Sequence, residues 1–257
     1  MTGFAAKDLT HNAFLGGKIH LWQPSAGYRA GIDPVLLAAC VPASAGQAVL
    51  ELGCGAGAAI LCLAARVPGL TLNGVEIQPH YADLARRNAV ENNISLDVST
   101  ANLTSLPPDL RQISFDHVLA NPPYFRLGAH TAARDAGRAK ALGEETSLAA
   151  WIDTAARRLA PKGQLHMILR MERLPDLLAA CSGRLGSLEV LPIAARQGRA
   201  PELFILRARK GGRAGFRMHA ATNLHAGAAH GDDQDSYTAD INKILRNGAA
   251  LTWPGVR

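Results

Sequence analysis

The pattern of apolar and polar positions predicts a chain in which buried strands alternate with helices. Mostly apolar segments at 48–52, 70–75 and 115–120 are typical of strands covered on both faces of a parallel sheet. Apolar residues recur at helical spacing after the first two of these runs. Further helices are expected at 144–159, 174–181 and 236–247, and further strands within 94–103 and at 164–169, 187–193 and 202–209. The alternation predicts an α/β fold.

The two ends of the chain depart from this alternation. Residues 19–23 alternate like a short strand or a hairpin arm rather than opening a β-α unit. Asp33 followed by Pro34 predicts a helix start, with Asp33 as its N-cap. The last two expected strands are separated by few residues, which favours an antiparallel pair. We therefore expect an N-terminal cap segment (1–42), a catalytic domain (43–215) and a C-terminal appendage packed on that domain (216–257).

A glycine-rich turn follows the first buried strand. Gly53, Gly55 and Gly57 lie between that strand and the next helix, where backbone N–H groups can approach a ligand closely. The second strand ends in Glu76, at a spacing that suits a carboxylate bound to ribose hydroxyls. A tight turn and a solvated strand-end charge would leave the same pattern.

Glu51 separates two classes of nucleotide cofactor. A nicotinamide dehydrogenase would share the glycines and Glu76, and Ala58 is permitted at its third glycine position. A carboxylate two residues before the first glycine would repel a dinucleotide pyrophosphate, whereas it attracts the ammonium of S-adenosylmethionine. The sequence therefore favours a methyl-donor site.

Other candidate site residues lie near strand ends. Asn102 follows the third strand and could contact an adenine amino group or form an ordinary Asx turn. Tyr28 and Arg29 precede the first expected helix. Both could line the mouth of the site, with Tyr28 near the cofactor and Arg29 near the substrate. Alternatively, Tyr28 could be an ordinary packed side chain.

The segment Asn121-Pro122-Pro123-Tyr124-Phe125 carries the chemistry. Two prolines after a strand hold Asn121 in a stiff loop. If the Asn121 carboxamide oxygen and the Pro122 carbonyl each accept an N–H of a planar amine, its lone pair is freed to face an electrophile. Tyr124 can stack on the planar substrate. A proline-stiffened turn is the alternative.

Bulk composition allows this interpretation without requiring it. The 257 residues can bury one substantial core, and a net charge of +6 is compatible with a polyanionic partner. Four cysteines lack CxxC or zinc-ligand spacing and are expected to be reduced and buried, as in a cytoplasmic protein. We see no signal-peptide pattern, no run long enough to cross a membrane and no histidine pattern that predicts a metal.

Two basic segments are candidates for phosphate contacts. Residues 126–142, beginning at Arg126, have the character of a lid over the site, and 207–217 form a glycine-broken basic run. A solvated loop and a solvated linker are the alternatives.

The glycine turn with Glu51, Glu76 and the 121–124 tetrad resembles class I S-adenosylmethionine-dependent methyltransferases that modify amino groups. More narrowly, the chain resembles the bacterial valine-tRNA adenine-N6 methyltransferases, a likeness that includes 14–17, 27–33 and the closing Tyr237-Thr238 helix. The resemblance implies a Rossmann-like, seven-stranded, mostly parallel sheet with the last strand antiparallel. It also implies S-adenosylmethionine as donor, Asn121, Pro122 and Tyr124 as catalytic residues, and RNA, most plausibly tRNA, as substrate beside Pro123, Phe125, Arg126 and Arg29.

The chain departs from the family pattern at one residue and in its basic loops, which differ freely between members, and several alternatives stay open. Asn102 stands where the family usually has an aspartate, so its contact to adenine would lack charge assistance. The tetrad is shared with DNA adenine methyltransferases, against which the lack of a large recognition domain argues. It is also shared with enzymes that methylate glutamine amides of proteins, so a protein or a small molecule could be the substrate. A non-catalytic RNA-binding module is the alternative of another class, and the oligomeric state, monomer or homodimer, stays open.

Overall fold

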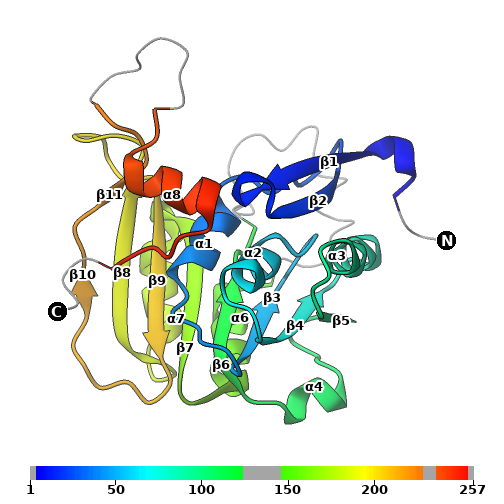
Figure 1. Ribbon diagram of the computed structural model, residues 1–257. Helices are drawn as coiled ribbons and strands as arrows, with labels where there is room; N and C mark the ends of the chain where they lie inside the picture. Colours follow the sequence, from blue (N-terminus) through cyan, green and yellow to red (C-terminus); the bar gives the residue numbers. More distant parts are fainter. Residues whose placement is uncertain (1–3, 124–145, 228–235, 254–257) are drawn as a thin grey trace, which may run out of the picture.

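The computed structural model describes residues 4–123, 146–227 and 236–253. Its centre is a sheet in the order β10-β8-β9-β7-β6-β3-β4-β5, with β11 also paired to β8 (Figure 1). The strands are β3 (Ala48–Leu52), β4 (Thr71–Glu76), β5 (Asp97–Thr100), β6 (Phe115–Ala120), β7 (Leu159–Arg170), β8 (Gly186–Ala194), β9 (Leu203–Arg209), β10 (Arg217–Met218) and β11 (Thr222–Asn223).

Strand directions confirm the expected Rossmann-like class. Strands β3 to β7 run parallel to their neighbours, whereas β9 is antiparallel to both β7 and β8. The expected count of seven strands holds for the long strands, and the two-residue strands β10 and β11 extend the sheet beside β8. Since parallel strands carry their loops on the same edge, the turns after β3, β4, β5 and β6 meet there.

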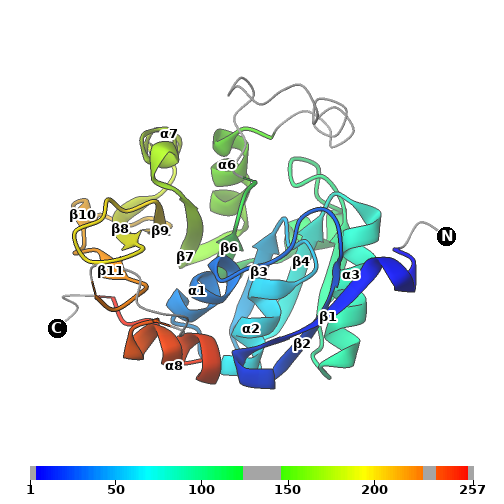
Figure 2. The ribbon, with the colours of Figure 1, turned by 90° about the horizontal axis from the view of Figure 1, so that it is seen from above.

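Helices cover both faces of the sheet (Figure 2). One layer contains α1 (Asp33–Cys40), α2 (Ala58–Arg66) and α8 (Ala239–Asn247), and the other contains α6 (Leu148–Arg158) and α7 (Leu174–Cys181). The remaining helices are α3 (Pro79–Glu91) and the short α4 (Pro108–Gln112). Each layer buries its own apolar cluster against the sheet, which is what near-continuous apolar strands require.

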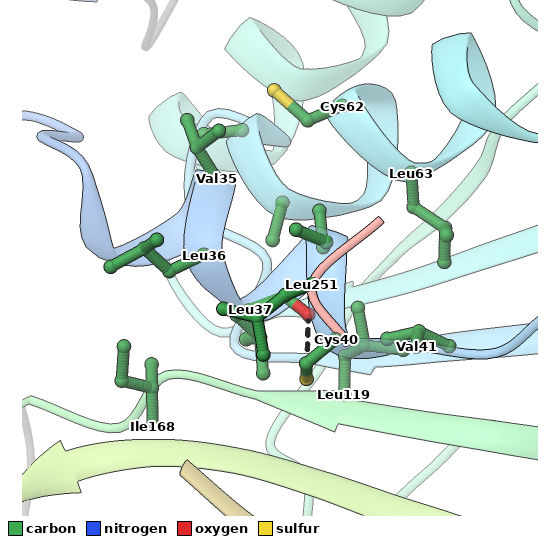
Figure 3. Close-up of a cluster of buried hydrophobic side chains, with 14 of the residues drawn as sticks. Val35, Leu36, Leu37, Cys40, Val41, Cys62, Leu63, Leu119, Ile168 and Leu251 are labelled. Carbon is green, nitrogen blue, oxygen red and sulfur yellow. Dashed lines mark hydrogen bonds between the residues drawn. The ribbon is translucent and has the colours of Figure 1, made fainter. Parts of the chain in front are cut away.

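The cluster under α1 joins residues from distant parts of the chain. Leu36, Leu37 and Val41 meet Leu63 of α2, Leu119 of β6 and Ile168 of β7, with Leu251 from the C-terminal segment (Figure 3). All of these side chains are buried. The N-terminal and C-terminal segments therefore share one core with the sheet.

A hairpin formed by β1 (Leu9–Phe14) and β2 (Ile19–Pro24) precedes α1, which confirms the expected hairpin arm. A 3₁₀ turn, η2 (Leu15–Gly17), joins its strands. An added Cβ at Gly16 would lie 2.4 Å from the carbonyl oxygen of Arg246, so the absence of a side chain lets this turn touch α8. The hairpin also contacts α2 and α3 through β2 (Figure 1).

Several expected boundaries were wrong, and α8 begins at Ala239 rather than at 236. Helix α1 begins at Asp33 with Ile32 as its N-cap, so Asp33 lies inside the first turn. Helix α6 begins at Leu148, capped by the Ser147 hydroxyl, rather than at 144. Strand β7 begins at Leu159 because that residue still pairs with Phe115, and the expected 161–163 turn is a bulge inside the strand, with φ of 70° at Lys162.

Candidate active site

The loops that follow β3 and β6 lie side by side. Leu52 pairs with Ala120 in the parallel ladder, so Gly53 and Asn121 leave the sheet from paired positions. A pocket opens between these loops and the segment that joins β2 to α1. Its lining contains Gln23, Tyr28, Ala30, Pro34, Glu51, Gly53, Cys54, Gly55, Ala56, Ala58, Ala59 and Asn121. The structure therefore brings together Tyr28, Glu51, Gly53, Gly55 and Asn121 of the predicted site.

Two positions of the glycine turn, Gly53 and Gly55, have backbone conformations that disfavour a side chain. Gly53 has a φ of 63°, and an added Cβ would lie 2.6 Å from the ring of Trp151 on α6. Gly55 has a φ of 52°, and its backbone N–H donates to Glu76. Gly57 is the N-cap of α2, so the turn delivers the positive end of that helix to the pocket.

Glu51 is a buried carboxyl group on the pocket wall. Its side chain is 3% exposed, and one oxygen accepts the backbone N–H of Ile60 at 3.0 Å. Burial raises its pKa to about 8, a rise that the nearby Glu76 charge reinforces and the Ile60 hydrogen bond opposes. A buried carboxyl with a raised pKa is a strong acceptor for a cation, because pairing relieves its desolvation.

Glu76 lies under the glycine turn rather than on the pocket wall described above. Its carboxylate accepts the backbone N–H of Gly55 and of Gln78, each at 2.9 Å. Burial raises its pKa, against the lowering effect of these hydrogen bonds. The Glu76 carboxylate therefore holds the glycine turn in place at the end of β4. Its binding to ribose hydroxyls stays a prediction.

Asn102 and Arg29 make local contacts in the structure. The Asn102 side-chain oxygen accepts the N–H and the hydroxyl of Thr104, at 2.9 and 2.8 Å, which is the Asx turn that the sequence left open. The Arg29 guanidinium donates to the Asn12 side chain at 3.1 Å. Their roles toward adenine and substrate stay predictions.

Tyr28 and Asn121 contact each other across the pocket mouth. The Asn121 Nδ2 lies 3.3 Å from the Tyr28 hydroxyl, to which it donates. Pro122 is buried and Pro123 is exposed, so the first proline anchors the loop. Tyr124, Phe125 and Arg126 lie outside the described residues, as does the 126–142 segment expected as a lid.

Sequence reasoning missed Gln23, which lines the pocket. Its side chain is buried, accepts the backbone N–H of Ala30 at 2.7 Å and donates to Asn12 at 3.3 Å. A glutamine at the end of an alternating strand is ordinary, and only its position on the inward face could have indicated a role.

The first part of the basic run 207–217 is bound within the fold. Arg207 makes two contacts of 2.9 Å with Glu189, Arg209 donates to the Lys162 carbonyl, and Lys210 donates to the Leu159 carbonyl. These contacts stabilise the sheet end around the β7 bulge. They leave little of the run's first half for phosphate binding.

The histidines and cysteines of the described residues form no group of three or more possible metal ligands. His219, which lacked a carboxylate nearby in sequence, contacts Glu189 at 2.8 Å through the fold. The four cysteines are free and buried, as expected. None of the helices in the described part of the chain is both long and apolar enough to cross a bilayer.

The pocket fits S-adenosylmethionine by the chemistry of its groups. The buried Glu51 carboxyl suits an ammonium, and the glycine turn exposes backbone to a ligand without side chains in the way. This arrangement, at the carboxyl ends of parallel strands, defines the class of the protein: a Rossmann-like methyltransferase that uses S-adenosylmethionine.

Comparisons with known proteins give the family. The model of the methyltransferase small domain matches residues 30–184, and the chain belongs to that family. A Porphyromonas gingivalis protein named tRNA1(Val) (adenine(37)-N6)-methyltransferase is 37% identical over 175 residues, which cover 64% of this chain and 68% of the relative. A relative of the same name from Actinobacillus succinogenes is 28% identical over 240 residues, which cover 91% and 96% of the two chains.

Solved structures agree on the fold. A predicted O-methyltransferase from Agrobacterium tumefaciens, protein Atu636, has a TM-score of 0.68 and 26% identity, covering 85% of this chain and 98% of its own. The T. thermophilus 16S rRNA N2 G1207 methyltransferase, solved with AdoMet and guanosine, has a TM-score of 0.55 and 21% identity, covering 79% and 50%. The second likeness shows the fold alone.

Proposed function

We propose that this protein methylates the N6 amino group of an adenine in tRNA, near the anticodon, with S-adenosylmethionine as the methyl donor. The observation that carries the proposal is the position of Asn121. It lines the same pocket as Glu51 and the glycine turn, at the end of the strand next to theirs. The Asn121 carboxamide, which can accept hydrogen bonds, thus lies beside the place where the ammonium group of S-adenosylmethionine would bind.

The chain's own groups act by positioning. S-adenosylmethionine, when bound, supplies an electrophilic methyl group. The Asn121 side-chain oxygen and the Pro122 carbonyl would accept the two N–H bonds of the adenine amine, which turns its lone pair toward that methyl. Buried Pro122 limits the movement of this pair. The predicted stacking of Tyr124 on the base would hold the adenine in line.

The substrate class rests on the relatives and on charge. The Porphyromonas gingivalis and Actinobacillus succinogenes relatives carry the name tRNA1(Val) (adenine(37)-N6)-methyltransferase. A net charge of +6 favours a polyanionic substrate. We propose action in the cytoplasm, where tRNA is found, and a reaction that needs no metal.

Nucleoside mass spectrometry tests the proposal. tRNA from cells that lack the gene should lose one N6-methyladenine, and the purified protein should restore it with S-adenosylmethionine. Asn121→Ala should keep donor affinity and lose transfer by on the order of 10²-fold or more, as for other lost preorganised polar groups. Unchanged turnover in Asn121→Ala would refute the role of this loop.

The same labelled donor can be offered to total RNA and to total protein. Label in RNA supports the proposal, whereas label in protein alone would favour the amide-methylating alternative. RNA binding without any methyl transfer would favour the non-catalytic alternative.

A further inference from the structure

The segment between β2 and α1 contacts the catalytic loop through one side chain. Tyr28 lies on this segment and is half exposed. Its hydroxyl accepts a hydrogen bond from Nδ2 of Asn121, at 3.3 Å. Its ring also approaches the glycine turn, 3.9 Å from where a Cβ of Gly55 would be. Tyr28 therefore stands between the two loops that form the pocket.

Three separate elements contact residues 28–30 of this segment. The Tyr81 hydroxyl on α3 donates to the Tyr28 carbonyl at 3.1 Å. The buried Gln23 on β2 accepts the Ala30 N–H at 2.7 Å. Asn12 on β1 accepts from the Arg29 guanidinium at 3.1 Å. The segment that carries Tyr28 is thus held to β1, β2 and α3.

The direction of the contact between Tyr28 and Asn121 has a chemical consequence. A carboxamide has a donor end and an acceptor end that point in different directions, and the proposed reaction needs the acceptor end on the substrate amine. When Nδ2 faces the Tyr28 hydroxyl oxygen, Oδ1 faces away from it. Turning the amide over would bring Oδ1 to Tyr28 and present N–H bonds to the amine, which has nothing to accept them while its lone pair is delocalised.

We propose that Tyr28 is a positioning residue for methyl transfer: its hydroxyl accepts from Nδ2 of the Asn121 carboxamide and holds that side chain where Oδ1 can accept from the substrate amine. The proposal rests on the proposed function, because it needs Asn121 to accept from the amine. It assigns a task to the N-terminal hairpin, which fixes Tyr28 through Asn12 and Gln23.

Tyr28→Phe is the direct test, since it removes the hydroxyl and keeps the ring. With labelled S-adenosylmethionine and tRNA from cells lacking the gene, kcat should fall about three- to tenfold, the size of one lost neutral hydrogen bond. The Kd for S-adenosylmethionine and the melting temperature should match those of the unaltered protein. Tyr237→Phe, in which a tyrosine stacked on His225 loses its hydroxyl, is the matched control and should change none of these quantities.

An unchanged kcat in Tyr28→Phe would overturn the proposal. So would a fall in kcat accompanied by an equal loss of donor affinity, because that pattern means that Tyr28 only shapes the donor pocket. An increase in the KM for tRNA alone would mean that the Tyr28 hydroxyl contacts the substrate directly and would also overturn it.

A double-mutant cycle with Asn121→Asp identifies the cause of the effect. The two side chains share one contact, so the change in kcat caused by Tyr28→Phe should differ between the Asn121→Asp variant and the unaltered protein. An equal fall in both backgrounds would contradict an action of Tyr28 through Asn121. Asn121→Ala in the same assay separates the two levels: if it keeps full activity, the proposed function fails, and if it is inactive while Tyr28→Phe is normal, only the inference about Tyr28 fails.

Discussion

The side chain of Asn88 on α3 pairs with the backbone of Trp22 on β2 as a neighbouring strand would. Its oxygen accepts the Trp22 N–H at 2.8 Å, and its nitrogen donates to the Trp22 carbonyl at 3.1 Å. The same nitrogen donates to the Ala56 carbonyl of the glycine turn at 2.9 Å. One residue thus joins the hairpin, a helix and the candidate donor site.

One helical turn further on, Asn92 repeats the pairing with His20. The His20 N–H donates to the Asn92 oxygen at 2.8 Å, and the Asn92 nitrogen donates to the His20 carbonyl at 2.7 Å. Residues four apart share a helix face, and residues two apart share a strand edge, so the two periods match here. The edge of β2 is therefore covered by a helix rather than by another strand.

Asn88→Ala should destabilise the protein by about 3 kcal/mol, because it removes three hydrogen bonds of a buried side chain and leaves their backbone partners unpaired. The free energy of unfolding in urea measures this. Asn242→Ala, on the half-buried side of α8, is the control and should change stability by no more than about 0.5 kcal/mol. Equal losses in the two variants would show that the pairing with Trp22 contributes nothing specific.

The elements that the sequence predicted well are those whose burial is visible locally. The bounds of β3, β6 and α7 match the expected ranges because these segments are mostly apolar and end at glycine, proline or polar residues. The turn that carries Glu51, Gly53 and Gly55, and its neighbour that carries Asn121, were likewise predicted from strand ends. Their meeting in one pocket follows from parallel pairing.

The features that escaped prediction depend on partners far along the chain. Asn88 looks like a polar residue on an amphipathic helix, and its partner Trp22 is 66 residues away. Arg207 reads as part of a basic run until Glu189 is seen beside it on the next strand. Side chains of this kind acquire their roles from the tertiary fold, which no local pattern encodes. The division at residues 42 and 215 stays a prediction.

Glu76→Ala should weaken S-adenosylmethionine binding by about one to two tenfold steps, since a charged hydrogen bond to a ribose hydroxyl contributes ~1.5–3 kcal/mol. Calorimetric titration measures the affinity. Glu76→Gln separates this effect from the support of the turn, because its amide oxygen can still accept from Gly55 or Gln78. An affinity equal to that of the unaltered protein in Glu76→Ala would reject the ribose role.

Donor binding should release a proton from Glu51. With its pKa raised to about 8 by burial, this carboxyl is mostly protonated at pH 7 in the free protein. Pairing with an ammonium favours the carboxylate, so affinity should rise with pH toward about 8, by at most about tenfold per unit. Above that pH the gain should end, because an α-amino group itself loses its proton near 7.7–8.0.

Calorimetry in buffers of different ionisation enthalpy counts the released protons. Glu51→Gln has no carboxyl to ionise, so it should bind the donor more weakly and without this release. The same proton count for the unaltered protein and Glu51→Gln would mean that Glu51 stays protonated and that its proposed pairing with the ammonium is wrong.

The buried pair of His117 and His166 should make the protein lose stability in mild acid. Their rings meet at 3.3 Å between Nδ1 and Nε2, and the outer ring nitrogens face Gln47 at 3.2 Å and the Cys40 sulfur at 3.9 Å. Burial lowers the pKa of His117 from 6.5 to about 4, and burial with the charges of His117, Arg207 and Arg66 holds the pKa of His166 well below 6.5. The unfolded chain therefore binds more protons than the folded one below pH 6.5. Stability should fall from pH 6.5 down to about 4, by about 3 kcal/mol for His117 alone, because its pKa is lowered by 2.5 and each pKa unit corresponds to ~1.36 kcal/mol.

Urea unfolding at pH 7 and pH 4.5 measures the loss, and His117→Gln, which cannot titrate, should lose correspondingly less. Because the raised pKa of Glu51 acts in the opposite direction, the difference between the two proteins decides the matter, and parallel pH dependences would exclude His117 as a source of acid sensitivity.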